Sequence, residues 1–303
     1  MTWSIVPLDL GQVDLNPRRL VPNPGAVPMV RVPVQSWLLR SAQHAVVIDT
    51  GFRHPDILLR LGDRARGVEV PAQRLAAQLA RHGVAPGDVR YVLHTHLHID
   101  HAGQTDIFPM ATTAVVNRRE LEYAVSGLSG PSYPPEDIKH MIDRLHTRGA
   151  LRLLDLELTG GEGILDGIRC VAAGAHTEGS MIVYVDTAAG LACFCGDLVY
   201  SVKHQLLSPA TLDADPGLTA NYVVSRRSEK AAMKRMLQSA PRFTLYPSHD
   251  RSVVIDHGRV ADDGHEGEGC GAGGCWCHLT ESGGVSVGAG AAAPATAAPP
   301  AAH

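Results

Sequence analysis

A histidine-rich segment constrains this chain most: the run Thr95-His96-Leu97-His98-Ile99-Asp100-His101-Ala102-Gly103, which follows an apolar stretch at 89–94. His96 and His98 are two residues apart, so on an extended segment both side chains point the same way and can bind one metal ion. Asp100 and His101 come next, in an expected turn, where they can face a second metal ion. The segment therefore predicts that the chain folds around a metal site.

Three further candidate ligands follow other expected strands: His176 after 168–173, Asp197 after 191–195 and His249 after 243–246. Imidazole and carboxylate ligands without thiolate suit Zn²⁺, Fe²⁺, Mn²⁺ or Co²⁺. A lone histidine is more often structural, but seven such residues in this order predict a two-metal site with open positions for solvent, as catalysis requires. The expected division is His96, His98 and His176 for one metal, Asp100, His101 and His249 for the other, and Asp197 between them.

Periodicity and turn residues indicate the secondary structure around these ligands. We expect strands at 34–40, 45–50, 89–94, 114–116, 151–158, 168–173, 181–186, 191–195 and 243–246, and helices at 71–81, 118–125, 136–147 and 228–240. This order favours an α/β or α+β fold over a parallel βαβ array.

The composition suggests one catalytic domain at 1–260, with an insertion at 126–150, and a tail at 261–303. The insertion, with Tyr133, Met141 and Leu145, could form a substrate lid or a dimer contact. The tail is rich first in Gly and Cys and then in Gly, Ala and Pro, so we expect it to be disordered. Cysteines 270, 275 and 277 with His278 have the composition of a zinc site, but their spacing matches no common zinc module.

Charge and hydropathy exclude several classes of function. The 27 basic and 31 acidic residues give a net charge of −4, without the basic stripe that a nucleic-acid-binding protein needs. No apolar run approaches the roughly 18 residues of a membrane span, and the N-terminus lacks a signal-peptide pattern. We therefore expect a cytoplasmic protein, monomeric or homodimeric, that acts on a small-molecule substrate. Its 6 cysteines should be reduced, and Cys170, Cys193 and Cys195 should pack in the core.

The order HxHxDH, then His, Asp and His, resembles the metallo-β-lactamase superfamily over about residues 30–250. This resemblance implies an α/β fold, the αββα sandwich, with the metal ions at one edge. Within the superfamily, the chain is most similar to the N-acyl-homoserine lactonases. It shares the run 96–103 followed by Phe108, a tyrosine (Tyr200) three residues after Asp197, and the opening hairpin at 32–51. It departs from that family at Gln104-Thr105, where lactonases usually carry Gly-Asn, and at Glu178, where they usually carry Pro.

The resemblance also implies a mechanism. Two divalent ions, Zn²⁺ in the first place, would lower the pKa of a bridging water from about 15.7 to about 7, and the hydroxide would attack the ester carbonyl of a lactone. The Tyr200 hydroxyl and one metal would stabilise the oxyanion, and Asp100 would carry the proton to the leaving alkoxide. The expected activity is opening of N-acyl-homoserine lactones, that is, quorum quenching.

Two alternatives remain at this point. The first is another hydrolase of the same fold, acting on a thioester, ester or amide, such as a glyoxalase II type enzyme or a biosynthetic-pathway hydrolase. The second is a diiron redox protein, which is disfavoured because the segment after Ala261 is too poor in apolar residues to form a flavin-binding domain.

Overall fold

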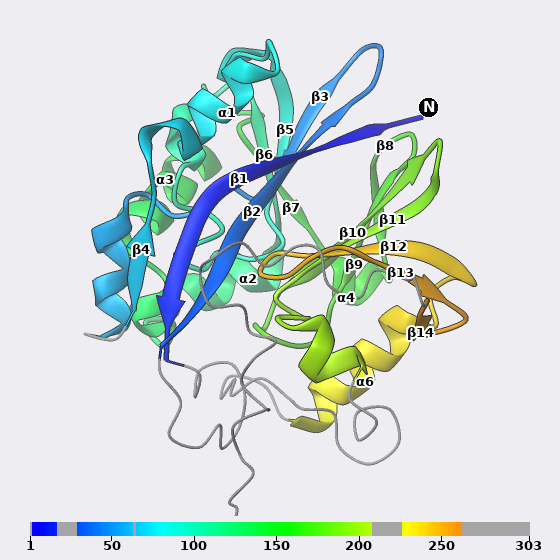
Figure 1. The fold of residues 1–303 in the computed structure, drawn as a ribbon. Coiled ribbons are helices and arrows are strands. Elements are labelled where there is room, and N and C mark those ends of the chain that lie inside the picture. The colour runs from blue at the N-terminus through cyan, green and yellow to red at the C-terminus, as the bar shows by residue number, and fades with distance from the viewer. Residues whose placement is uncertain (1, 17–28, 63–64, 208–225, 262–303) are drawn as a thin grey trace, which may run out of the picture.

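Two β-sheets face each other at the centre of the molecule, and helices cover their outer faces (Figure 1). The computed structural model describes residues 2–16, 29–62, 65–207 and 226–261. Within these residues the layers follow the order helix, sheet, sheet, helix, as the family resemblance implied. The expected disordered tail, with its three cysteines, lies outside the described residues.

The first sheet has seven strands in the order β4-β1-β2-β3-β5-β6-β7. Strands β3, β5, β6 and β7 run parallel, so this half of the sheet is a parallel array, contrary to the expectation from element order. Because the carboxyl ends of parallel strands meet at one edge, the loop after β5 lies at that edge. The strands are β1 (Ser4–Leu15), β2 (Val30–Arg40), β3 (Ala45–Ile48), β4 (Arg66–Val68), β5 (Val89–Leu93), β6 (Thr113–Asn117) and β7 (Leu151–Leu154).

The second sheet also has seven strands, in the order β14-β13-β12-β11-β10-β9-β8. Only the β11–β12 pair is parallel, and α6 (Arg226–Leu237) lies between these two strands in the chain. The strands are β8 (Glu162–Leu165), β9 (Ile168–Ala172), β10 (Met181–Thr187), β11 (Gly190–Gly196), β12 (Arg242–Pro247), β13 (Val253–Asp256) and β14 (Arg259–Val260).

The helices pack on the sheets through apolar faces. Leu75 and Leu79 of α1 pack on the outer face of the first sheet, and Met233 and Met236 of α6 pack on the second. The other α-helices within the described residues are α2 (Arg118–Ala124), α3 (Pro135–Leu145) and the short α4 (Leu156–Thr159); α1 itself covers Leu75–Arg81. None of the helices in the described ranges is long and apolar enough to cross a membrane.

Alternation along the central strands separates two hydrophobic cores. In β2, Trp37 and Leu39 point into the layer between the sheets, whereas Leu38 points outward toward the helices. All three are fully buried, and each such large side chain contributes roughly 1.5–3 kcal/mol. On the facing sheet, Phe194 packs against the Trp37 ring with centroids 5.0 Å apart. Burial on both faces explains why the end of β2, at 37–39, and β3 read as continuous apolar runs.

One prediction of secondary structure was wrong, and one long strand was missed. The strand expected at 151–158 ends at Leu154, and the chain turns into α4, which ends at Gly160 with φ 69°. This turn buries Leu156 but leaves Leu158 86% exposed, which breaks strand alternation. The long strand β1 was not predicted at all, because Pro7, Gly11 and a bulge between Asp9 and Gln12 interrupt its pattern.

The cysteine prediction was correct for the described residues. Cys170, Cys193 and Cys195 are free thiols buried in the core, and burial raises the pKa of the Cys170 and Cys195 thiols to about 12. They therefore stay uncharged at neutral pH and act as small apolar side chains.

Candidate metal centre

All seven predicted ligands meet at one edge of the two sheets. His96, His98, Asp100 and His101 lie in the loop after β5 of the first sheet. The other three come from the second sheet: His176 between β9 and β10, Asp197 directly after β11, and His249 two residues after β12. The site therefore joins the two halves of the sandwich.

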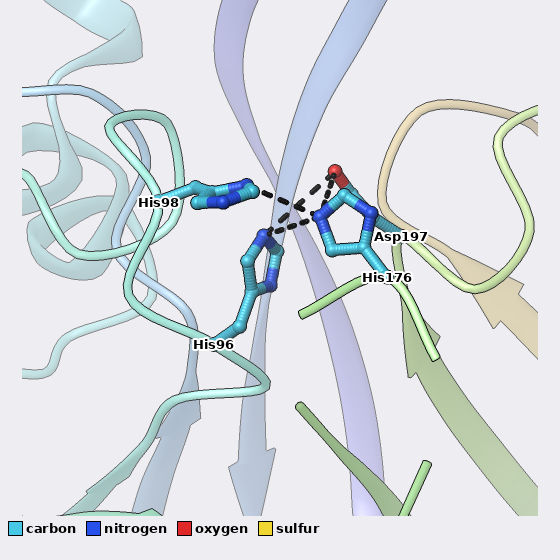
Figure 2. Close-up of side chains that lie close together, drawn as sticks. All are labelled: His96, His98, His176 and Asp197. Atoms are coloured by element: carbon cyan, nitrogen blue, oxygen red, sulfur yellow. Dashed lines mark hydrogen bonds and ion pairs between the residues drawn. The ribbon is translucent and has the colours of Figure 1, made fainter. Parts of the chain in front are cut away.

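The first group of potential ligands is His96, His98, His176 and Asp197 (Figure 2). The His176 Nε2 atom lies 3.1 Å from His96 Nε2 and 3.1 Å from His98 Nδ1. One ligand atom from each residue falls within 4.8 Å of all the others. Four side chains that offer nitrogen or oxygen lone pairs to one point form a pattern that suits a tetrahedral metal ion.

The second group is Asp100, His101 and His249. The Oδ2 atom of Asp100 lies 3.5 Å from His249 Nε2, and its Oδ1 lies 3.8 Å from His101 Nε2. Asp100 is partly exposed, whereas both histidines are buried. The exposed carboxylate marks the side on which this group opens to solvent.

Asp197 stands between the two groups and turns one carboxylate oxygen to each. Its Oδ2 lies 3.5 Å from His176 Nε2 and 3.8 Å from His96 Nε2 in the first group. Its Oδ1 lies 3.1 Å from His101 Nε2 and 3.3 Å from His249 Nε2 in the second. One carboxylate can thus serve two cations at once.

Three of these buried atoms lie close together without a well-directed hydrogen bond. Asp197 Oδ1 is 3.1 Å from His101 Nε2 and 3.3 Å from His249 Nε2, yet none of the three has a partner of good hydrogen-bond geometry. An unsatisfied buried polar atom costs about 1–3 kcal/mol, so three beside one another need an explanation. A divalent cation would coordinate all three, and the imidazole–carboxylate donor set fits such an ion.

Asp49, at the end of β3, orients the second group and was not singled out in the sequence. Its Oδ1 accepts a hydrogen bond from the Thr95 backbone N–H at 2.8 Å, and its Oδ2 accepts one from the Thr95 hydroxyl at 2.7 Å. The same Oδ2 lies 2.9 Å from His101 Nδ1. A proton on Nδ1 leaves His101 Nε2 free to bind a metal, as in many carboxylate–histidine pairs. The signal available was an aspartate between a buried strand and Thr50-Gly51.

A backbone carbonyl orients the other histidine of this group. His249 Nδ1 donates to the Pro33 carbonyl of β2 at 2.7 Å, which turns Nε2 toward Asp197. The neighbouring Asp250 caps a loop instead, because its Oδ2 accepts from the Val202 backbone N–H at 2.7 Å.

Two residues of the centre have strained backbones. Asp49 has φ 57° and His176 has φ 72°, in the left-handed region that residues with a Cβ rarely adopt. Each such residue costs about 1–3 kcal/mol and persists only where the surroundings hold it. The strain therefore concentrates where side chains must converge.

Burial keeps the histidines of the first group uncharged. Burial lowers the pKa of His98 and of His176 to about 3, so both imidazoles are neutral at pH 7, as ligands must be. Burial also acts to lower the pKa of His101, but the carboxylates of Asp197, Asp100 and Asp49 outweigh it and raise that pKa well above its usual value. The second group thus carries more negative charge around its histidines.

Comparison with known proteins decides the family. The model of the metallo-beta-lactamase superfamily matches residues 29–249, most of the chain. The chain belongs to this superfamily. The match runs from the start of β2 to His249, so it covers strands β2 to β12 and all seven candidate ligands.

Several relatives within the superfamily are named as lactonases. An N-acyl homoserine lactonase from Bacillus cereus is 26% identical over 186 residues, which cover 58% of this chain and 68% of that protein. A Bacillus thuringiensis AiiA variant with N-decanoyl-L-homoserine bound at its active site has TM-score 0.66 and 20% identity, covering 82% of this chain and 94% of that one. AidC, a dizinc quorum-quenching lactonase in complex with a product, has TM-score 0.58 and 15% identity, covering 82% and 87%. The protein is accordingly a metal-dependent hydrolase with the metallo-β-lactamase fold.

Tyr200 is the other residue predicted in the active site of this metallo-β-lactamase-fold protein. Its ring stacks on His249 with centroids 5.3 Å apart and meets His176 edge-on at 5.6 Å. Burial and the nearby carboxylates of Asp197 and Asp100 raise the pKa of Tyr200 well above its usual value. Its hydroxyl therefore keeps its proton and can donate it in a hydrogen bond.

Residues at which the chain departs from the lactonase pattern of the superfamily have structural partners. Gln104 Oε1 accepts the Leu75 backbone N–H at the start of α1, and the Thr105 hydroxyl lies 3.1 Å from His94 Nε2. His94 is buried, and burial lowers its pKa to about 4. Glu178 forms an exposed ion pair with Arg119.

The segment expected as an insertion packs against the metal-binding loop. Tyr133 is buried and meets the His98 ring edge-on with centroids 4.9 Å apart. Met141 of α3 packs with Leu97 and Ala102, on either side of His98. This segment therefore supports the first group of ligands from behind; a lid or dimer role stays a prediction.

Proposed function

We propose that the protein is a dinuclear metallohydrolase that opens lactones, with N-acyl-homoserine lactones as the substrate class. The position of Asp197 carries the proposal, because its two oxygens face two separate groups of ligand atoms. The first cation would be held by His96, His98, His176 and Asp197, and the second by Asp100, His101, His249 and Asp197. Zn²⁺ is the expected ion, and Fe²⁺, Mn²⁺ and Co²⁺ are compatible with the same ligands.

The side chains divide the chemical work. When bound, the cations would supply Lewis acidity and a water molecule of lowered pKa. The Tyr200 hydroxyl, which stacks over His249, would donate a hydrogen bond to the carbonyl oxygen of the substrate as negative charge develops there. Asp100, partly exposed beside the second group, would pass a proton to the leaving alkoxide.

The substrate class rests on relatives and on Tyr200. The curated relative is named an N-acyl homoserine lactonase, and two fold neighbours carry acyl-homoserine products. A tyrosine placed three residues after Asp197 and stacked at the centre suits a substrate with one reactive carbonyl. Activity of this kind would make the protein a quorum-quenching enzyme acting on a small molecule.

The test is hydrolysis by the purified full-length chain, with its metal content measured. Proton release at pH 7.5 is followed with N-hexanoyl-homoserine lactone and, in parallel, with a thioester, S-lactoylglutathione. The matched control is the double variant Asp100→Asn, His101→Ala, which removes two ligands of the second group. Turnover of the lactone that needs metal and is lost in the control is the expected result. Turnover of the thioester alone, with two metals bound, would contradict the lactone assignment and indicate a thioesterase.

A further inference from the structure

Glu120, in the first turn of α2, is a buried carboxylate that the proposed chemistry does not use. Its side chain has no solvent exposure, yet it has hydrogen bonds on both oxygens. Its Oε1 accepts from the Leu97 backbone N–H at 2.8 Å and from the Tyr133 hydroxyl at 3.0 Å. Its Oε2 accepts from the Thr177 hydroxyl at 2.6 Å and from the Gly179 backbone N–H at 3.2 Å.

Three of these four donors belong to the segments that carry histidines of the first group, and the fourth, Tyr133, packs against one of those histidines. Leu97 lies between His96 and His98, and Thr177 follows His176 directly. Tyr133 packs its ring against His98. Glu120 therefore joins the loop after β5 of the first sheet to the turn between β9 and β10 of the second.

We propose that Glu120 is a positioning residue for the first group alone, holding His96 and His98 at a fixed distance from His176. This inference rests on the proposed function in so far as those histidines bind a metal ion. The second group has its own supports, Asp49 behind His101 and the Pro33 carbonyl behind His249. Loss of Glu120 should therefore affect the two metal positions unequally.

The four hydrogen bonds that Glu120 accepts require a carboxylate. Four donors point at Glu120, and an ionised carboxylate is the side chain of this size that accepts on both oxygens and donates nothing. A glutamine of the same shape would place its NH₂ group against either the Leu97 or the Gly179 backbone N–H, whichever way the amide turned. A hydroxyl can rotate away from such a contact, but a backbone N–H cannot.

The experiment is a Co²⁺ titration of metal-free full-length protein, followed by visible absorption and by competition with a chelator. The variants are Glu120→Gln and, as the matched control, Glu122→Gln, which changes an exposed carboxylate on the same helix. We expect Glu122→Gln to match the wild type. In Glu120→Gln one Co²⁺ equivalent should bind 10- to 100-fold more weakly with an altered spectrum, and the other should change less than about twofold, in line with known effects of groups that orient metal ligands.

A milder variant covers the case in which Glu120→Gln does not fold. Thr177→Val keeps the shape of the side chain and removes the 2.6 Å hydrogen bond to Oε2. It should weaken the same Co²⁺ equivalent severalfold. Wild-type binding of both equivalents in the variants that fold, or equal weakening of both, would overturn the proposal. Because the readout is metal binding, failure to hydrolyse a lactone would leave this result intact.

Discussion

Single side chains set the chemistry at the centre, and Tyr200 gives the most direct test of it. We expect Tyr200→Phe to lower kcat for lactone hydrolysis by roughly 10²-fold, the usual effect of removing one hydrogen-bond donor to an oxyanion. Its metal content should stay at the wild-type value, because the ring still stacks on His249. Steady-state kinetics beside metal analysis checks this. A kcat within twofold of the wild type would remove Tyr200 from the mechanism.

A second residue, Asp137 of α3, predicts how stability depends on pH. Its side chain is fully buried beside Arg53, 2.8 Å from Nε, with Glu136 and Asp106 also near. Burial raises the pKa of Asp137 from 3.8 to about 6, so the folded protein binds more protons than the unfolded chain between about pH 4 and pH 6. The contribution of Asp137 to stability is therefore largest below pH 4 and falls as the pH rises toward 6.

Asp137→Asn isolates this contribution. The free energy of unfolding of the wild type minus that of the variant should fall by roughly 2 kcal/mol between pH 4 and pH 7. Chemical denaturation across this range measures it, and Asp143→Asn, on the exposed side of the same helix, controls for the lost carboxyl group. A difference that stays constant or rises with pH would contradict the assignment.

The sequence was informative about residues whose role follows from their type and their place at a strand end. His176, Asp197 and His249 could be predicted as parts of the centre because each follows an apolar strand. Asp49 and Glu120 could not, because their roles arise only from contacts with residues far along the chain. Thr95 is 46 residues from Asp49, and Thr177 is 57 residues from Glu120.

At the scale of elements, the close approach of α2 to the turn before β10 holds His176 in place. Gly179 makes this approach possible: a Cβ on it would lie 2.5 Å from the Glu120 Cα and closer still to the Glu120 backbone nitrogen. Gly179→Ala should therefore push the turn away from α2, lowering the thermal midpoint by several degrees and the affinity of the first metal position by 10-fold or more.

Gly87→Ala is the matched control for this variant. A Cβ on Gly87 would meet nothing within 4 Å, and its φ is not in the left-handed region. We expect its midpoint and metal affinity to equal those of the wild type within error. Calorimetry and Co²⁺ titration compare the two variants, and equal behaviour would show that α2 and the turn do not depend on their contact.

Helices and strands were predicted where one hydrophobic periodicity dominates the segment. They were missed where a second feature, such as a bulge, disturbs that periodicity. The helix expected at 71–81 contains α1, preceded by a short 3₁₀ turn at Pro71–Gln73. Strand β1 was not predicted for two reasons. Its bulge shifts the alternation of buried and exposed side chains, and it contains residues that favour turns. The parallel half of the first sheet was missed because strand direction depends on connections, such as that through α1, and not on local pattern.

At the scale of the whole molecule, the metal centre also connects the two sheets. Four of its ligands follow β5 of the first sheet, and three follow strands of the second. Bound cations would thus hold both halves, and they would coordinate the buried His101 Nε2, His249 Nε2 and Asp197 Oδ1 atoms, which lack well-directed hydrogen bonds. Because the cations would bind the folded chain and not the unfolded one, metal binding should increase the free energy of unfolding.

Removal of the metal measures how much the bound cations contribute to the stability of the fold. A cation present at about 1,000 times its Kd stabilises the folded state by about 4 kcal/mol, which for a domain of this size corresponds to a fall in Tm on the order of 10 °C after chelation. The His101→Ala variant, which lacks a ligand of the second group, should lose less on chelation, because one position is already weakened. Thermal unfolding with and without chelator, with metal content measured in each sample, gives the comparison. An unchanged Tm in protein proven metal-free would mean that the sheets are held by their apolar core alone, and that the converging ligands serve chemistry without contributing to cohesion.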